Sequence, residues 1–176
     1  QFDAPGRGFS FRVDEPLDMR MDPTLPISAA DILRDYSAEQ LADVFFHLGE
    51  EYKSRVIARA IVEARRTQPV ATTGQLELLV RRALRVRGHR RIHPATKVFQ
   101  SLRLETNHEL ESLAALLAGA PELLRDGGTL AIITFHSLED RPVKQRYKAL
   151  AATGRFQIPV KFVRPAEEEL EQNPRS

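Results

Sequence analysis

The sequence predicts an α/β protein, namely the latter part of an α/β domain preceded by an all-helical insertion. Two observations lead to this fold class. Between residues 28 and 117, apolar side chains recur at helical spacing, whereas "GGTLAII" at residues 127–133 is a Gly-Gly turn followed by an apolar run. Such a run is typical of a buried strand in a parallel sheet. Residues 158–163, "IPVKFV", are a weaker strand candidate, so this chain is expected to supply only part of a sheet.

The helical stretch is divided by capping residues and prolines. Ser28 and Ser37 are each followed three residues later by an Asp or Gln, which is the form of a capping box. Residues 50–66 carry an apolar stripe on one face and basic residues mostly on the other, which is the pattern of an amphipathic helix. The helices are predicted to begin at Ser28, Ser37, Glu50, Thr73 and Pro94, the last running to Leu117. Residues 1–27, rich in Gly, Pro and Asp, are predicted to form a connection with turns.

The segment "TFHSLEDR" directly follows the predicted strand. His136 would lie just past the carboxyl end of that strand, where open α/β sheets bind their ligands. Ser137 and Asp140 have the spacing of an N-cap and its capping-box partner, so helix capping explains them without any reaction site. Capping does not explain His136, which is therefore the candidate functional residue of this segment.

Basic residues are concentrated in one part of the chain. The whole chain has 26 basic and 24 acidic residues, but from Arg81 to Arg103 there is no Asp or Glu. The cations in that stretch are Arg81, Arg82, Arg85, Arg87, Arg90, Arg91, Lys97 and Arg103. Together with His93 before a helix start, this pattern suits the phosphates of a nucleic acid, although a solvated charged helix explains it equally well.

Composition excludes several other classes of protein. The chain has no cysteine, so neither a disulfide framework nor a thiolate metal site is predicted, and no HExxH or P-loop motif is present. No metal is therefore expected. The chain has no run of about 18 apolar residues to span a membrane. With no Trp and three Tyr, a base-stacking platform is not evident.

Asp18 and Arg20 alternate with apolar residues in "PLDMRMD". This alternation is consistent with a short half-buried strand, and the same two polar side chains are also candidates for a site. The sequence pattern alone leaves both interpretations open.

Seven blocks together resemble the RsmH (MraW) family of S-adenosylmethionine-dependent methyltransferases, which act on a cytidine N4 of small-subunit ribosomal RNA. In chain order the blocks are "RGFSFR", "PLDMRMD", "GEE...RVIARAIVEAR", "HPATKVFQSLR", "NHELESL", "DGGTLAIITFHSLEDR" and "NPRS". The resemblance implies a Rossmann-like class I methyltransferase domain with an inserted all-helical RNA-recognition domain. Residues 1–23 would lead into the insertion, residues 24–96 would form it, and residues 97–176 would return to the catalytic domain.

The resemblance also suggests roles for individual residues. Gln1 matches a cofactor contact in the family, and the cofactor implied is S-adenosylmethionine. We hypothesise that His136 and Asp18 line the pocket for the reacting base. The residues expected to bind RNA are Arg20, Arg90, Arg91, His93, Lys97 and Arg103. Glu15 departs from the family, whose members commonly have Gly at that position.

The resemblance implies a bacterial cytoplasmic enzyme whose partner is small-subunit ribosomal RNA or the assembling subunit, with no membrane. The oligomeric state is left open, a dimer included. The family's Gly-rich cofactor loop and ribose-binding acid have no counterpart here, so this segment alone is expected to be inactive. The alternative is a non-catalytic RNA-binding module, or an inactive fragment, derived from such an enzyme.

Overall fold

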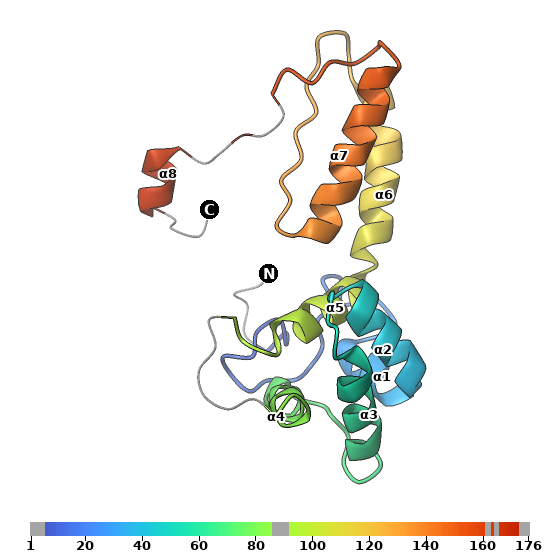
Figure 1. The fold of residues 1–176 in the computed structure, drawn as a ribbon, viewed down its shortest axis with the longest axis vertical. Helices are drawn as coiled ribbons and strands as arrows, with labels where there is room; N and C mark the ends of the chain where they lie inside the picture. The colour runs from blue at the N-terminus through green and yellow to red at the C-terminus, as the bar shows by residue number, and fades with distance from the viewer. Residues whose placement is uncertain (1–5, 86–91, 161–162, 164–165, 173–176) are drawn as a thin grey trace. The chain divides into compact units, whose positions relative to one another are not determined.

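The computed structural model describes residues 6–85, 92–160, 163 and 166–172 and divides into two units, residues 1–112 and 113–176 (Figure 1). The described part of the first unit is helical: α1 (Ala29–Asp35), α2 (Ala38–His47), α3 (Ser54–Ala64), α4 (Thr73–Ala83) and α5 (Thr96–Asn107). Helix α6 (Glu109–Gly119) leads into the second unit, which contains a 3-10 turn (Ala120–Leu123), α7 (Ser137–Ala152) and α8 (Glu167–Gln172). No helix among the described residues combines the length and the apolar character needed to cross a membrane.

Three helices of the first unit begin with complete capping boxes. The Ser28 hydroxyl accepts from the backbone N–H of Asp31, whose carboxylate accepts from the N–H of Ser28, and Ser37 makes the same exchange with Gln40. Each box satisfies backbone donors that the helix itself leaves unpaired. These two predicted starts are confirmed. The third box belongs to α4, where the cap is Thr72, one residue before the predicted start.

The core of the first unit lies between α1, α2, α3, α4 and α5. It also takes Leu17 and Met19 from the segment before α1. Burial of a large apolar side chain contributes about 1.5–3 kcal/mol, so these two residues anchor that segment to the helices. The core thus draws on residues from both sides of the range 24–96; the predicted domain boundaries themselves stay a prediction.

The single helix predicted over residues 95–117 is wrong, because the chain breaks at His108. This residue has a left-handed backbone conformation (φ 49°), which ends α5 and separates it from α6. The apolar spacing continued through the break and therefore concealed it. The Arg103 guanidinium bridges it by donating to both Glu109 carboxylate oxygens, at 2.8 and 3.0 Å.

The buried strand predicted at residues 127–133 does not form. Among the described residues no strand is present, apart from an isolated bridge between Pro16 and Thr72. Residues 129–134 are irregular, and Ile133 and the following Phe135 are 83% and 89% exposed. A strand is defined by hydrogen bonds to a neighbouring strand, and none of the described residues forms a strand beside this segment. The described part of residues 158–163 likewise forms no strand, while residues 161–162 lie outside the described residues. The α/β class is therefore not confirmed by this chain, whose described architecture is helical.

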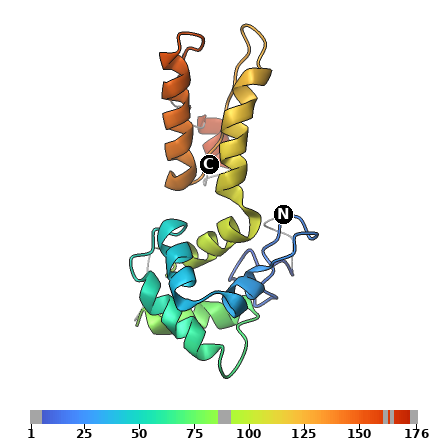
Figure 2. The same cartoon turned by 90° about the vertical axis from the view of Figure 1, so that its right-hand side faces the viewer.

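In the second unit α6 and α7 lie side by side (Figure 2), and a side-chain contact joins them. The Arg146 guanidinium on α7 donates to the Leu117 carbonyl on α6 at 3.0 Å. The Tyr147 hydroxyl donates to the Leu130 carbonyl at 3.1 Å, which ties the segment before His136 to α7. Helix α7 therefore supports residues 127–133, the irregular segment that was predicted to be a strand.

Candidate functional site

The loop of residues 16–22 is fixed around Met19. Met19 has a left-handed backbone conformation (φ 60°) although its side chain is buried, with 1% of its surface exposed. A residue with a long side chain adopts this conformation at a cost and only where its surroundings impose it. The backbone N–H groups of Leu17 and Met19 donate to the carbonyls of Ala71 and Arg7, at 2.9 and 2.8 Å. The loop is thus tied to two other segments of the first unit.

Asn107, the last residue of α5, supplies two more ties of this loop, beside those from the Arg7 side chain and from the backbone of α1. Its amide group donates to the Met19 carbonyl at 2.7 Å and to the Arg103 carbonyl at 2.8 Å. Its side-chain oxygen accepts from the N–H of Met21 at 2.6 Å. The block "NHELESL" belongs to the family resemblance, but the sequence predicted no role for Asn107 itself. An Asn at the end of a helix, before a break, is the signal that could have identified it.

Asp18 and Arg20 form a forked ion pair within the loop. The Arg20 guanidinium donates to Oδ1 and Oδ2 of Asp18 at 2.7 and 2.9 Å, and its third group donates to the Leu25 carbonyl at 2.8 Å. The hydrogen bond from Arg20 lowers the pKa of Asp18 below its ordinary value. Asp18 is therefore ionised at neutral pH and acts as an acceptor only. Both side chains stabilise the loop, and their predicted roles in a base pocket and in RNA binding stay predictions.

Glu15 binds the glycine-rich turn before the loop. Its carboxylate accepts from the backbone N–H groups of Gly6 and Gly8, the latter at 2.9 Å. Gly8 has φ +73°, and a Cβ there would lie 2.5 Å from the Pro16 carbonyl oxygen, so a side chain cannot be accommodated. Glu15 thus stabilises the close contact between the backbone of Gly8 and that of Pro16. Members of the family that the sequence resembles commonly have Gly in place of Glu15.

His136 lies at the start of α7, in the second unit. It is the N-cap residue and Ser137 is the first helical residue, so the prediction of Ser137 as N-cap is wrong by one position. The carboxylate of Asp140 pairs with Lys144 at 2.6 Å instead of completing a capping box. The backbone of His136 is extended (φ −150°, ψ 165°), as is usual for an N-cap residue. Its carbonyl accepts from the N–H groups of Glu139 and Asp140.

The His136 ring is buried beside a carboxylate. Its Nε2 lies 3.3 Å from Oε1 of Glu139, within ion-pair distance but without hydrogen-bond alignment, and neither ring nitrogen has a hydrogen-bond partner among the described residues. The second oxygen of Glu139 accepts from the Phe135 N–H at 2.9 Å. Buried polar atoms are normally hydrogen-bonded, so the two covered ring nitrogens of His136 are an exception that capping does not explain. His136 and the Asp18 loop belong to different units, and each is described by itself.

Three further residues predicted to bind RNA have intramolecular partners, as Arg20 does. His93 accepts from the Ala95 N–H at its Nδ1 (3.3 Å), and its Nε2 lies 3.1 Å from Glu77 of α4. Lys97 donates to the Glu50 carbonyl at 2.7 Å, and Arg103 is paired with Glu109. The stretch without acids in the sequence is therefore approached in space by acids from outside it. Arg90 and Arg91 lie outside the described residues, and the RNA-binding role of the whole set stays a prediction.

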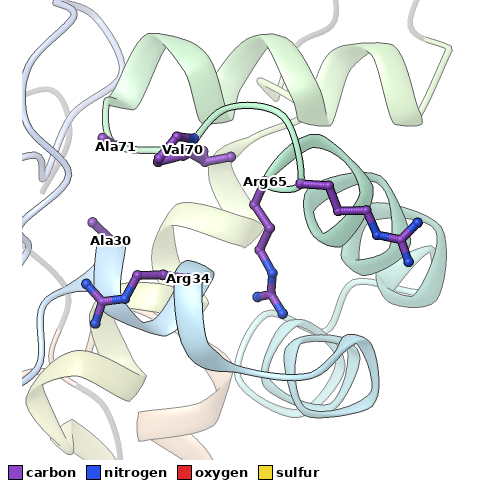
Figure 3. Close-up of a pocket in the computed structure, with 7 residues that line it drawn as sticks. Ala30, Arg34, Arg65, Val70 and Ala71 are labelled. Carbon is purple, nitrogen blue, oxygen red and sulfur yellow. The ribbon is translucent and has the colours of Figure 1, made fainter.

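A hollow of about 410 Å³ opens between α1 and the end of α3. Figure 3 shows Arg34 and Arg65 among its lining residues. Arg65 donates to the carbonyls of Leu33 and Tyr36 at 2.6 and 2.7 Å and so caps the end of α1, while Arg34 pairs with Asp31 and Asp35. Both guanidinium groups are thus engaged within the protein, and the hollow carries no assignment to S-adenosylmethionine. Gln1, the predicted cofactor contact, lies outside the described residues.

Comparison with known proteins gives a consistent result. The whole chain, residues 1–176, matches a family model described as the MraW methylase family. It is 47% identical to the ribosomal RNA small subunit methyltransferase H of Acidobacterium capsulatum, covering all of this chain and 59% of that protein. It is 49% identical to the enzyme of the same name from Thermomicrobium roseum, covering all of this chain and 59% of that protein. The chain thus spans about 60% of the length of these relatives.

Proposed function

Since the chain belongs to the MraW methylase family, we propose that it is the RNA-recognition insertion and the following part of the catalytic domain of a ribosomal RNA methyltransferase. The observation that carries this proposal is the match of the family model to all 176 residues, together with relatives named as small-subunit rRNA methyltransferases. The whole protein would transfer a methyl group from S-adenosylmethionine to the N4 amine of a cytidine in the decoding region of 16S rRNA.

The helical first unit is assigned to RNA recognition. Arg82 and Arg85 at the end of α4 are exposed, as are Arg55 and Arg59 on α3. Guanidinium groups bind phosphate oxygens in pairs, and such contacts give an affinity that falls as salt concentration rises. These exposed arginines support an RNA-binding role better than Arg103, whose guanidinium is already paired with Glu109.

His136 is assigned to the reacting base. The cytosine amine is a weak nucleophile because its lone pair is delocalised into the ring, so catalysis depends on positioning and on hydrogen bonds that strengthen as charge develops. The ring nitrogens of His136 have no hydrogen-bond partner among the described residues, and one of them would accept such a hydrogen bond once the ring is uncovered to the base. The base must be unpaired or flipped out of a helix to reach it.

A gene deletion tests the proposed activity. Nucleosides released from 16S rRNA of cells lacking the gene should show loss of one N4-methylated cytidine by mass spectrometry, and a plasmid copy of the whole gene should restore it. Unchanged methylation in the deletion strain would rule out the activity. The 176-residue chain by itself should give no methylation in the same measurement.

The second candidate is a non-catalytic RNA-binding module, which the exposed arginines of α3 and α4 would serve equally well. The two functions differ in a simple measurement on the whole natural protein. Binding of small-subunit rRNA without any methyl transfer would favour the module, whereas methyl transfer to one cytidine would favour the enzyme.

A further inference from the structure

Three aromatic side chains gather at the turn between α2 and α3. Tyr52 is 86% exposed and Phe46 is 45% exposed. Their ring centroids are 6.4 Å apart in an edge-to-face arrangement, and the His47 ring lies 5.1 Å from that of Phe46. Exposed aromatic rings grouped in this way mark a binding surface more often than isolated apolar residues do. The sequence gives little sign of this cluster because aromatic residues are few and these three are not at a regular spacing.

The turn that presents Tyr52 is tightly constrained. A Cβ on Gly49 would lie 2.7 Å from the carbonyl oxygens of both Phe45 and Lys97, so the turn packs backbone to backbone against the start of α5. The next residue, Glu50, has a left-handed conformation (φ 49°), and the Glu51 N–H donates to the Phe45 carbonyl at 3.0 Å. A strained backbone at an exposed turn is a feature of binding sites, where it positions a side chain in advance.

Lys97 places a positive charge beside the Tyr52 ring. Its ammonium group lies 5.6 Å from the ring centroid and donates to the Glu50 carbonyl at 2.7 Å. The same lysine therefore contacts both the strained turn and the exposed ring. An aromatic ring with a fixed cation next to it offers one surface to a base and one charge to the adjoining phosphate.

The surroundings of the cluster favour a nucleotide over a protein partner. Lys53 follows Tyr52 and Arg55 is the second residue of α3, while Asp43, Glu50 and Glu51 supply acidic groups nearby in sequence. The central part of a protein–protein interface is depleted of charged residues, and a ring surrounded by charges on both sides does not meet that condition. Because these acids offset the cations around Tyr52, stacking rather than net charge would supply the affinity.

We propose that Tyr52, with Phe46 at its edge and Lys97 beside it, is a binding site for an unpaired base of the RNA substrate. This inference rests on the proposed function, since it assigns a further contact to the same substrate. The site is separate from the one assigned to His136, and it holds the RNA through a stacked base that does not react.

The experiment measures binding of the 176-residue chain to a fluorescently labelled ten-nucleotide single-stranded RNA and to a duplex of the same length, by fluorescence anisotropy. Loss of one stacked base weakens binding by about tenfold. We expect Tyr52→Ala to weaken single-strand binding by about that factor, Tyr52→Phe to preserve it, and neither to alter duplex binding. Leu78→Ala is the matched control, because Leu78 is 45% exposed, like Phe46, but lies on α4.

A second readout detects the stack directly. The chain has no Trp, so Tyr52→Trp introduces a single indole whose fluorescence should be quenched by single-stranded RNA. The slope of affinity against salt concentration should be the same for wild type and Tyr52→Ala, because no ion pair is removed.

Each other outcome overturns the site in a distinguishable way. Equal single-strand binding by wild type and Tyr52→Ala would remove this site and leave the proposed function standing. Equal losses on single strand and duplex would show that the effect is not stacking. If Tyr52→Ala instead changed the sedimentation behaviour of the chain and not its RNA affinity, the cluster would be a protein contact. If wild type bound no RNA at all, the RNA-recognition role of the first unit would fall as well.

Discussion

The side chain of Asn107 holds the backbone of Met19, 88 residues away in sequence, through a hydrogen bond of 2.7 Å from its amide group to the Met19 carbonyl. The same amide oxygen accepts from Met21. One side chain thus fixes the backbone groups on either side of Arg20, and it connects the end of α5 to the loop that contains Asp18 and Arg20.

Replacing Asn107 by Ala should destabilise the first unit. The carbonyl of Met19 and the N–H of Met21 would lose their partner in a partly buried place, and each such loss costs about 1–3 kcal/mol. We expect the free energy of unfolding in urea to fall by about 2–4 kcal/mol. Gln100→Ala, also on α5, is the control and should change it by less than about 0.5 kcal/mol. Equal stabilities of the two variants would show that the loop does not depend on Asn107.

The ion pair of Asp18 and Arg20 should make stability depend on acid pH. The pKa of Asp18 is lowered in the folded state by its hydrogen bond from Arg20, relative to an ordinary value of 3.8. Folding is therefore stabilised by this group above about pH 4, and that contribution disappears as pH falls through the lower folded pKa. The measurement is urea unfolding between pH 5 and pH 2.

The control for this prediction is Asp18→Asn, which keeps the shape of the side chain and removes the titrating group. Its stability should fall less steeply with acid than that of the wild type. Parallel pH profiles for the two proteins would show that Asp18 contributes nothing to the acid limb, and that other lowered carboxylates, such as Asp31, account for it.

Replacing His136 by Ala in the whole enzyme should lower the turnover number by about 10²-fold, the usual cost of one lost polar contact to the reacting group. Affinity for S-adenosylmethionine, measured by calorimetry, should change little. Asp140→Asn is the matched control on the same helix turn, since its carboxylate pairs with Lys144 and not with the His136 ring. Undiminished turnover in the His136 variant would exclude it from the base pocket.

Gly49 and Gly119 should respond in opposite ways to a single added methyl group. A Cβ at Gly49 would lie 2.7 Å from two carbonyl oxygens, so Gly49→Ala should lower the free energy of unfolding by about 2 kcal/mol or more. A Cβ at Gly119 meets nothing within 4 Å, and Ala there should stabilise α6 by about 0.5–1 kcal/mol. Thermal unfolding followed by circular dichroism measures both; similar shifts in the two variants would contradict the contact that Gly49 makes with α5.

The sequence predicted the helices of the first unit well where local chemistry determines them. Ser28 and Ser37 with their partners three residues later specify helix starts through side-chain bonds to adjacent backbone, so no distant contact is needed. The break at His108 was missed because its cause is not local: the side chain of Asn107 binds a loop 86 to 88 residues away, which the helical spacing cannot reveal.

The candidate site was less accessible to prediction for a related reason. His136 could be predicted from its place after an apolar run. Its position beside the Glu139 carboxylate depends on the side-chain geometry at the start of α7, which the sequence does not reveal. The absence of acids between residues 81 and 103 suggested unpaired cations, whereas Glu77 and Glu109, just outside that stretch, fold back onto His93 and Arg103. Likewise, the cluster of Phe46 and Tyr52 arises from a turn geometry that composition does not encode.

The exposed segment before His136 has a consequence for handling the chain in solution. Residues 129–135 present Ile133 and Phe135 to solvent in an extended run that is rich in β-branched residues and contains no charge. Such a run is a template onto which a second extended chain can add by backbone pairing, with side chains interlocking between copies. Aggregation of the 176-residue chain should therefore increase steeply with protein concentration. Ile133→Lys would place a charge in this segment and so oppose fibre formation.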